Sequence, residues 1–127
     1  MRMILTALAI AALAAPGGAR DRNIVPEATL AGKPQSCISI RNIRQSHVRT
    51  DKVIDFEMAG GQTYRSVMPQ SCPSLAFEDR FTYTTSLSVL CSTDIITVLY
   101  ASPELSRGAS CGLGEFQPVK LVKPARR

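Results

Sequence analysis

The chain has 127 residues, of which fifteen are basic and ten acidic, for a formal net charge of +5. This length fits a single domain behind a leader. Residues 20–119 carry ten basic and ten acidic side chains, so the surplus comes from Arg2 in the leader and from Lys120, Lys123, Arg126 and Arg127 at the C-terminal end. A nucleic-acid-binding domain needs a basic face on the fold itself, which this distribution argues against. We favour a solvated tail, with weak attraction to an anionic membrane surface as the other interpretation.

The first nineteen residues predict a cleavable signal helix. Arg2 precedes an apolar run over 4–15, and small residues follow, the layout of a secretory signal. Small residues at Gly17 and Ala19 place the expected cleavage between Ala19 and Arg20. The apolar run is too short to span a bilayer, which takes ~20 residues. We therefore expect a periplasmic or secreted protein with no transmembrane span after the leader is removed.

Four cysteines indicate two disulfide bonds. An even number in a short exported chain is typical of a disulfide framework. Zinc ligands usually come in close pairs, whereas the gaps here are 34, 18 and 19 residues. No metal ion or cofactor is therefore expected. Three pairings are possible, and we favour Cys37–Cys111, between the first and last strands, with Cys72–Cys91 closing a middle loop.

The N-terminal half of the exported chain predicts an arm and a meander. Residues 20–35 contain prolines and glycine without periodicity and predict an extended arm. Three antiparallel strands follow, over 36–48, 54–58 and 63–68. The first has a break in its alternation, which we interpret as a bulge between Ile40 and Ile43.

The C-terminal half predicts a helical turn and further strands. Ser74 is a candidate cap for a turn over 75–79. A β-prone segment at 80–85, a loop or an irregular strand at 86–93, an apolar strand at 95–100 and a loop at 102–108 come next. The last strand covers 115–122, where Pro118 requires an edge or a bulge.

These elements predict an all-β domain over residues 36–122, followed by a basic tail at 123–127. Five or six short strands with one helical turn suit a small antiparallel curled sheet or barrel. The order of the elements is also compatible with an OB-fold. Tyr64, Phe81 and Tyr83 could stack on single-stranded nucleic acid, but core packing is the interpretation we favour. We expect a monomer.

Several short segments beside and between the cysteines form a pattern: Cys37-Ile38, Ile54-Asp55-Phe56, Tyr64-Arg65, Cys72-Pro73-Ser74-Leu75, Arg80-Phe81-Thr82-Tyr83, Leu90-Cys91-Ser92-Thr93-Asp94 and Cys111-Gly112-Leu113-Gly114-Glu115-Phe116. With this pattern the stretch 37–119 resembles a family of small exported bacterial proteins that have four cysteines and no assigned function. The resemblance implies a compact disulfide-bonded β domain. It implies no catalytic residue, ligand or partner.

Two acidic residues and one histidine are the first candidates for chemistry. Asp55 and Glu57 lie two apart on a strand, so their side chains share one face. Paired carboxylates can perform acid–base catalysis, but we favour the solvated face of a half-buried strand. His47 has Ser46 and Asp51 nearby, yet a catalytic triad brings its residues together from separate loops.

Other candidate residues have structural interpretations. Asp94 is expected to accept backbone hydrogen bonds in a turn. Met58 and Met68 are expected to fill the core rather than bind a soft metal. Gly112 and Gly114 are expected to permit a turn or close strand packing.

No catalytic signature emerges, so the primary hypothesis is an exported non-enzymatic β domain, an envelope-associated or binding module. Its partner would be an envelope or extracellular protein or a small ligand. The alternative is an inhibitor of an extracellular or periplasmic hydrolase, which would use a bridge-anchored loop at 86–93 or 102–110. A small hydrolytic enzyme is the second alternative.

Overall fold

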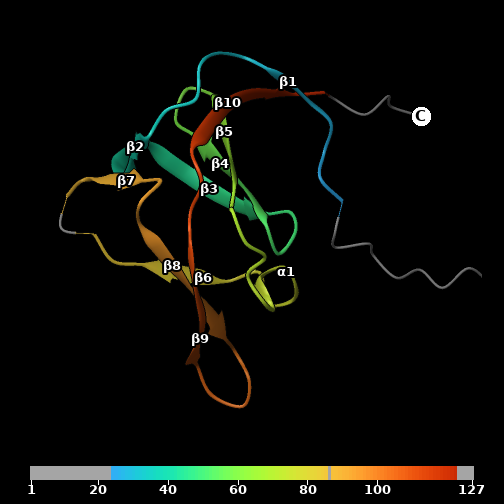
Figure 1. Ribbon diagram of the computed structural model, residues 1–127, viewed down its shortest axis with the longest axis vertical. Coiled ribbons are helices and arrows are strands. Elements are labelled where there is room, and N and C mark those ends of the chain that lie inside the picture. The colour runs from blue at the N-terminus through green and yellow to red at the C-terminus, as the bar shows by residue number, and fades with distance from the viewer. Residues whose placement is uncertain (1–23, 86, 123–127) are drawn as a thin grey trace, which may run out of the picture.

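A computed structural model describes residues 24–85 and 87–122, which form three antiparallel sheets and confirm the all-β class (Figure 1). The expected signal helix, the cleavage between Ala19 and Arg20 and the basic tail at 123–127 lie outside the described residues. The strands are β1 (Ala28–Leu30), β2 (Cys37–Ser39), β3 (Ile43–Val48), β4 (Val53–Met58), β5 (Thr63–Val67), β6 (Phe81–Tyr83), β7 (Val89–Cys91), β8 (Ile95–Tyr100), β9 (Ser106–Gly112) and β10 (Phe116–Leu121), and helix α1 spans Leu75–Glu78.

The largest sheet has the strand order β1-β10-β5-β4-β3. It contains the predicted three-strand meander, with the last strand, β10, placed between β5 and β1. A second sheet has the order β6-β8-β9, and β2 pairs with β7 alone. Figure 1 shows the β8–β9 hairpin extending away from the large sheet. The described residues thus contain more strands than the five or six expected, and their sheets do not close into a barrel.

Local chemistry explains the meander. The Thr50 hydroxyl accepts hydrogen bonds at 3.0 Å from the amides of Lys52 and Val53, which forms the tight turn before β4. Gly60 and Gly61 adopt positive φ values of 95° and 89° and form the turn between β4 and β5. Both turns bring neighbouring strands into antiparallel pairing.

The core lies between the inner face of the large sheet and the strands β6 and β8. Phe56 of β4 is completely buried and contacts Phe81 and Phe116 edge to face, with ring centroids 6.4 and 5.7 Å apart. Tyr64 is buried, and Phe81 and Tyr83 are partly buried against the core, as predicted. Met58 and Met68 are both buried in this cluster, as predicted.

The first predicted strand is interrupted. The break in its alternation is not a bulge, because β2 ends at Ser39 and a 3-10 turn over Ile40–Asn42 leads into β3. The amide of Ile40 donates to the carbonyl of Ser88 at 3.0 Å, which holds the turn against the segment before β7. The chain changes sheets at this point, so β2 and β3 belong to different sheets.

All four cysteines form disulfides, but the favoured pairing was wrong. The bonds are Cys37–Cys91 and Cys72–Cys111. Cys37 and Cys91 lie directly opposite each other on β2 and β7, with their Cα atoms 4.0 Å apart. Cys111 belongs to β9, not to the last strand, and it joins the second sheet to the segment before α1. The large sheet has β1 and β3 as its edges, and neither strand carries a cysteine to close it.

Pro118 does not lie in an edge strand, because β1 flanks β10. Its carbonyl accepts the amide of Ala31 at 2.9 Å, and Gln35 then pairs with Phe116. From Ala31 to Gln35 the chain takes four steps while β10 takes two, so the ladder is irregular beside Pro118, in agreement with the predicted bulge. The predicted arm at 20–35 thus includes a short strand that extends the large sheet.

Two further predictions need correction, the Ser74 cap and the loop at 102–108. Ser74 makes no capping hydrogen bond from its side chain, and the carboxylate of Asp51 accepts the Ala76 amide of α1 at 2.8 Å instead. Residues from Ser106 onward in the expected loop at 102–108 form β9, whereas the strand alternative for 86–93 is correct where β7 spans Val89–Cys91. No helix within residues 24–85 and 87–122 has the length and apolar character to cross a membrane.

Candidate functional site

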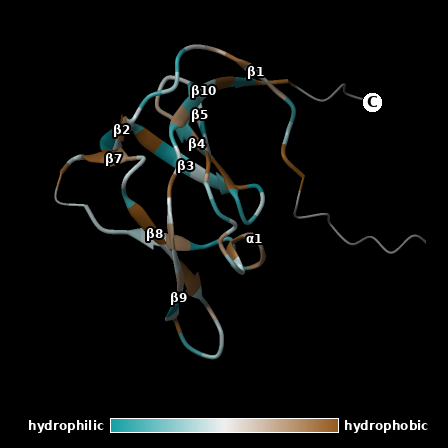
Figure 2. Ribbon diagram, in the orientation of Figure 1, coloured by the Kyte–Doolittle hydropathy of each residue, from teal (hydrophilic) through white to brown (hydrophobic). Residues whose placement is uncertain are grey.

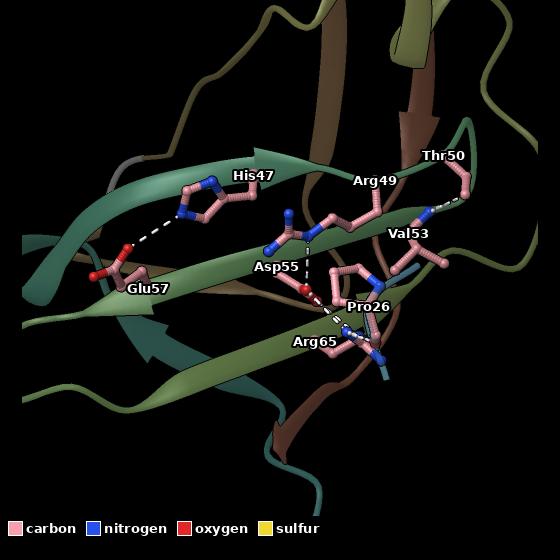
Figure 3. Close-up of polar contacts among 8 residues, drawn as sticks. All are labelled: Pro26, His47, Arg49, Thr50, Val53, Asp55, Glu57 and Arg65. Atoms are coloured by element: carbon pink, nitrogen blue, oxygen red, sulfur yellow. Dashed lines mark hydrogen bonds and ion pairs between the residues drawn. The ribbon is translucent and has the colours of Figure 1, made fainter. Parts of the chain in front are cut away.

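The outer face of the large sheet gathers charged residues from three neighbouring strands. Asp55 on β4 lies directly opposite His47 on β3 and Arg65 on β5. Residues directly opposite each other in antiparallel strands point to the same face, so the three side chains are neighbours. Figure 3 shows them together with Arg49, at the end of β3, and Glu57.

Asp55 is completely buried between two arginines. Arg65 donates to both of its carboxylate oxygens, from Nε at 2.8 Å and from Nη2 at 3.0 Å. Arg49 Nε donates to Oδ2 at 3.0 Å. The side chains of Arg49 and Arg65 are only 22% and 14% exposed, so both ion pairs are shielded from water. The expectation that Asp55 lies on the solvated face was therefore wrong.

Arg65 also holds the N-terminal segment on this face. Its Nη2 donates to the carbonyl oxygen of Pro26 at 2.9 Å (Figure 3). The amide of Val122 donates to the carbonyl of Glu27 at 2.9 Å, so the same segment is tied to the end of β10. These contacts explain the burial of Asp55, because the face carries a covering strand segment as well as the arginine side chains.

His47 and Glu57 form a second, more open pair. His47 Nε2 and Glu57 Oε2 are 3.1 Å apart, and the side chains are 30% and 43% exposed. The contact is diagonal across β3 and β4. Asp51 instead binds the start of α1, so the structure does not assemble His47, Ser46 and Asp51 into a triad.

An open groove of about 640 Å³ lies beside the His47–Glu57 pair. Its remaining lining comes from the N-terminal segment, the start of β5 and the end of β10, namely Pro26, Gly61, Thr63, Val119, Lys120, Leu121 and Val122. Aliphatic side chains and a proline form most of the walls. This volume, with mostly apolar walls and a few polar groups, is typical of small-ligand sites. We refer to this feature as the groove.

A smaller hollow of about 350 Å³ lies on the outer face of the second sheet. It is lined by hydroxyl-bearing residues including Thr82, Thr84 and Thr97, with Arg107 beside them. Thr97 and Ser110 form a hydroxyl–hydroxyl hydrogen bond of 3.0 Å across β8 and β9. Its lining is more polar than that of the groove, which makes it the weaker candidate for an apolar ligand.

The structural interpretations of Asp94 and Gly114 are confirmed. The Asp94 carboxylate accepts the amide of Cys91 at 2.7 Å. Gly114 packs against the backbone at Val67, where a Cβ atom would overlap the Val67 carbonyl oxygen, whereas Gly112 faces open space. No group of three histidine, cysteine, aspartate or glutamate residues among those described could hold a metal ion.

Part of this site could be found from the sequence. With a turn at Gly60–Gly61, counting back along the two strands places Arg65 opposite Asp55, and the complementary charges are a further signal. The groove could not be found this way. It depends on β10 pairing with both β5 and β1, and pairing between such distant segments leaves no local pattern.

Comparisons of the chain with protein-family models, curated proteins and solved structures gave no match.

Proposed function

We propose that this chain is an exported, non-enzymatic binding domain that holds a partly apolar ligand in the groove. The observation that carries the proposal is the juxtaposition of an apolar-walled groove with the half-exposed His47–Glu57 pair. The body of a ligand would contact Val119, Leu121 and Val122. Its polar group would bind at the pair and at the Thr63 hydroxyl, which supplies both a donor and an acceptor.

Export is supported by the two disulfides and by the predicted leader. Disulfide bonds form and persist in oxidising compartments. N-terminal sequencing of the protein from an envelope or periplasmic fraction is expected to begin at Arg20. A chain that still begins at Met1 in that fraction would contradict cleavage.

Binding in the groove can be tested with 8-anilinonaphthalene-1-sulfonate, which has an aromatic body and one charged group. Thr63→Phe places a ring into the groove from a position paired with Glu57 and Val119. Thr82→Phe is the matched control, because Thr82 also lies on an outer sheet face and lines the smaller hollow. We expect dye fluorescence with the wild type and with Thr82→Phe, and little with Thr63→Phe. Equal fluorescence from all three proteins would refute the groove as the site.

The second candidate function is inhibition of an extracellular or periplasmic hydrolase. It is favoured by Leu87, which is 67% exposed in the loop between β6 and β7. The Thr85 hydroxyl accepts the Leu87 amide at 3.3 Å, and the Cys37–Cys91 disulfide lies shortly after the loop. An inhibitor would present such an anchored side chain to a protease. Titration against a set of serine proteases tests this, with Leu87→Ser as the variant expected to lose inhibition.

A further inference from the structure

We propose that the end of the large sheet around the groove docks onto the surface of an anionic lipid bilayer. This proposal rests on the proposed function in one respect, which is that the exported chain is located in the envelope. We call this surface the apolar corner and define it by six residues of the N-terminal segment, β1 and the end of β10: Ile24, Val25, Leu30, Val119, Leu121 and Val122.

Strand pairing brings the apolar corner together. Leu30 lies directly opposite Val119, and Ala28 lies opposite Leu121. Directly opposite residues share a face, so Leu30, Val119 and Leu121 all lie on the outer face of the sheet. The hydrogen bond from the Val122 amide to the Glu27 carbonyl continues this pairing by one step. Segments from the two ends of the described chain thus form one surface.

Most of these side chains are in contact with solvent. Leu30 is 78% exposed, Ile24 62% and Val122 44%. Figure 2 shows the hydrophobic colour on the segment before β1 and at the C-terminal end of β10. Single exposed aliphatic residues are ordinary on a protein surface, but a group from adjacent strands indicates an interaction surface.

The charge next to the apolar corner favours anionic lipid as its partner. Lys120 lines the groove, and Lys123, Arg126 and Arg127 follow within seven residues of sequence. The rest of the exported chain, residues 20–119, has equal numbers of basic and acidic residues, so the surplus positive charge comes from the sequence that begins at Lys120 and continues past Val122. Basic residues next to aliphatic ones are typical of segments that lie in the interface of an anionic membrane.

Two acidic residues of the described chain, Glu27 and Glu57, lie near the apolar corner. Glu27 lies in the N-terminal segment and Glu57 lines the groove. Glu57 lies 3.1 Å from His47, and the sequence from Lys120 onward carries four basic residues and no acidic one. A bilayer satisfies both parts of the surface, since its acyl region receives the aliphatic side chains and its headgroups bind the basic ones. A nucleic acid would leave the aliphatic side chains exposed.

Co-sedimentation with lipid vesicles tests the proposal. The protein is recovered after export, with its N-terminus verified by mass spectrometry, and mixed with vesicles of phosphatidylcholine alone or with phosphatidylglycerol added. We expect binding to the mixed vesicles that is about tenfold stronger than to the neutral ones and that weakens as salt is raised. Equal binding to both vesicle types, or none to either, would overturn the proposal.

Three variants locate the binding surface. Leu30→Ser with Val122→Ser removes exposed side chains of the corner, and Lys123→Glu with Arg126→Glu and Arg127→Glu reverses the charge that follows Val122 in the sequence. The control is Leu87→Ser with Leu105→Ser, because these leucines are 67% and 69% exposed and lie in loops remote in sequence from the corner. We expect the first two variants to lose binding at least about fivefold and the control to keep it. Loss in the control, or full binding by both corner variants, would refute the assignment.

The vesicle experiment tests the docking proposal and the dye experiment tests the groove proposal, so either proposal can be refuted while the other stands. If the groove binds the dye but no variant or salt effect appears on vesicles, the docking proposal falls and the binding function stands. If Thr63→Phe leaves dye binding unchanged while the corner variants lose vesicle binding, the groove proposal falls and docking stands. Thermal unfolding of each variant accompanies these measurements, and the substitutions at the exposed residues Leu30, Val122, Leu87 and Leu105 are expected to leave it unchanged.

Discussion

Arg65 donates two hydrogen bonds to the carboxylate of Asp55, at 2.8 and 3.0 Å, and Asp55 has no exposed surface. A third bond from the same guanidinium reaches the Pro26 carbonyl at 2.9 Å. This one side chain therefore joins the sheet to the N-terminal segment that borders the groove. The stability of the outer face and the shape of the groove depend on the same contacts.

The buried charge of Asp55 should be essential to stability. Asp55→Asn keeps the size of the side chain but leaves Arg49 and Arg65 without their counter-charge. We expect the free energy of unfolding to fall by about 3 kcal/mol, as when one partner of a buried ion pair is removed. Urea unfolding followed by circular dichroism measures this. Glu57→Gln is the control, because its exposed pair with His47 should contribute less than about 1 kcal/mol. Equal effects of the two substitutions would contradict this account.

Arg65 should also hold the N-terminal segment against the sheet through its bond to Pro26, whereas Arg49 should not. Arg65→Met removes the bond to Pro26, whereas Arg49→Met removes a partner of Asp55 and leaves that bond intact. We expect hydrogen exchange of the Val122 amide to be about fivefold faster in Arg65→Met alone, the effect of a hydrogen bond worth ~1 kcal/mol. The readout is exchange at Val122 relative to a buried amide of β4. Faster exchange in both variants would show that the segment responds to the loss of charge pairing and not to the bond.

The sequence predicted the elements whose signals are local. The alternation of Ile54, Phe56 and Met58, with glycines at 60 and 61, predicted the β4–β5 hairpin correctly. The same alternation predicted Asp55 to be solvated, because a period of two shows which face a residue occupies and not what covers that face. Its cover comes from Arg49, Arg65 and Pro26, and only the first two lie near enough in sequence for pairing rules to place them.

The disulfide pairing failed for a related reason. It assumed a single sheet closed by a bond between its first and last strands. The turn at Ile40–Asn42 instead separates β2 from the meander, and β2 pairs with β7, which brings Cys37 opposite Cys91. Contacts between distant segments decide which sheet each strand joins. The spacing of the cysteines therefore does not predict their pairing.

The two disulfides should differ in their resistance to reduction. Cys37 is exposed, whereas Cys72 is completely buried, so a small thiol reaches the Cys37–Cys91 bond more readily. We expect dithiothreitol at low concentration to open Cys37–Cys91 first. Each bond closes a long loop, with separations of 54 and 39 residues, and each is worth about 4 kcal/mol in the chain-entropy model.

Alkylation followed by peptide mapping identifies the thiols released. Early labelling of Cys72 and Cys111 would contradict the predicted order of reduction. A non-reduced peptide that links Cys37 to Cys111 would contradict the pairing itself.

Gly114 should not tolerate a side chain. A Cβ at this position would overlap the Val67 carbonyl oxygen, and the Gly114 amide and carbonyl both bind the Ser66 hydroxyl, at 3.1 and 2.9 Å. We expect Gly114→Ala to lower the free energy of unfolding by about 1–3 kcal/mol. Gly112→Ala faces open space and should change it by less than about 0.5 kcal/mol. Urea unfolding of both variants distinguishes them, and a stable Gly114→Ala protein would show that β5 and the segment before β10 do not pack as described.

The groove as a binding site is the central claim, and the most direct measurement is a nuclear magnetic resonance titration of the ¹⁵N-labelled protein with 8-anilinonaphthalene-1-sulfonate. We expect saturable shift changes at the amides of Thr63, Leu121 and Val122, and none at Leu87 or Leu105. Shift changes centred on Leu87 or Leu105, or no saturable change in the groove, would contradict that claim.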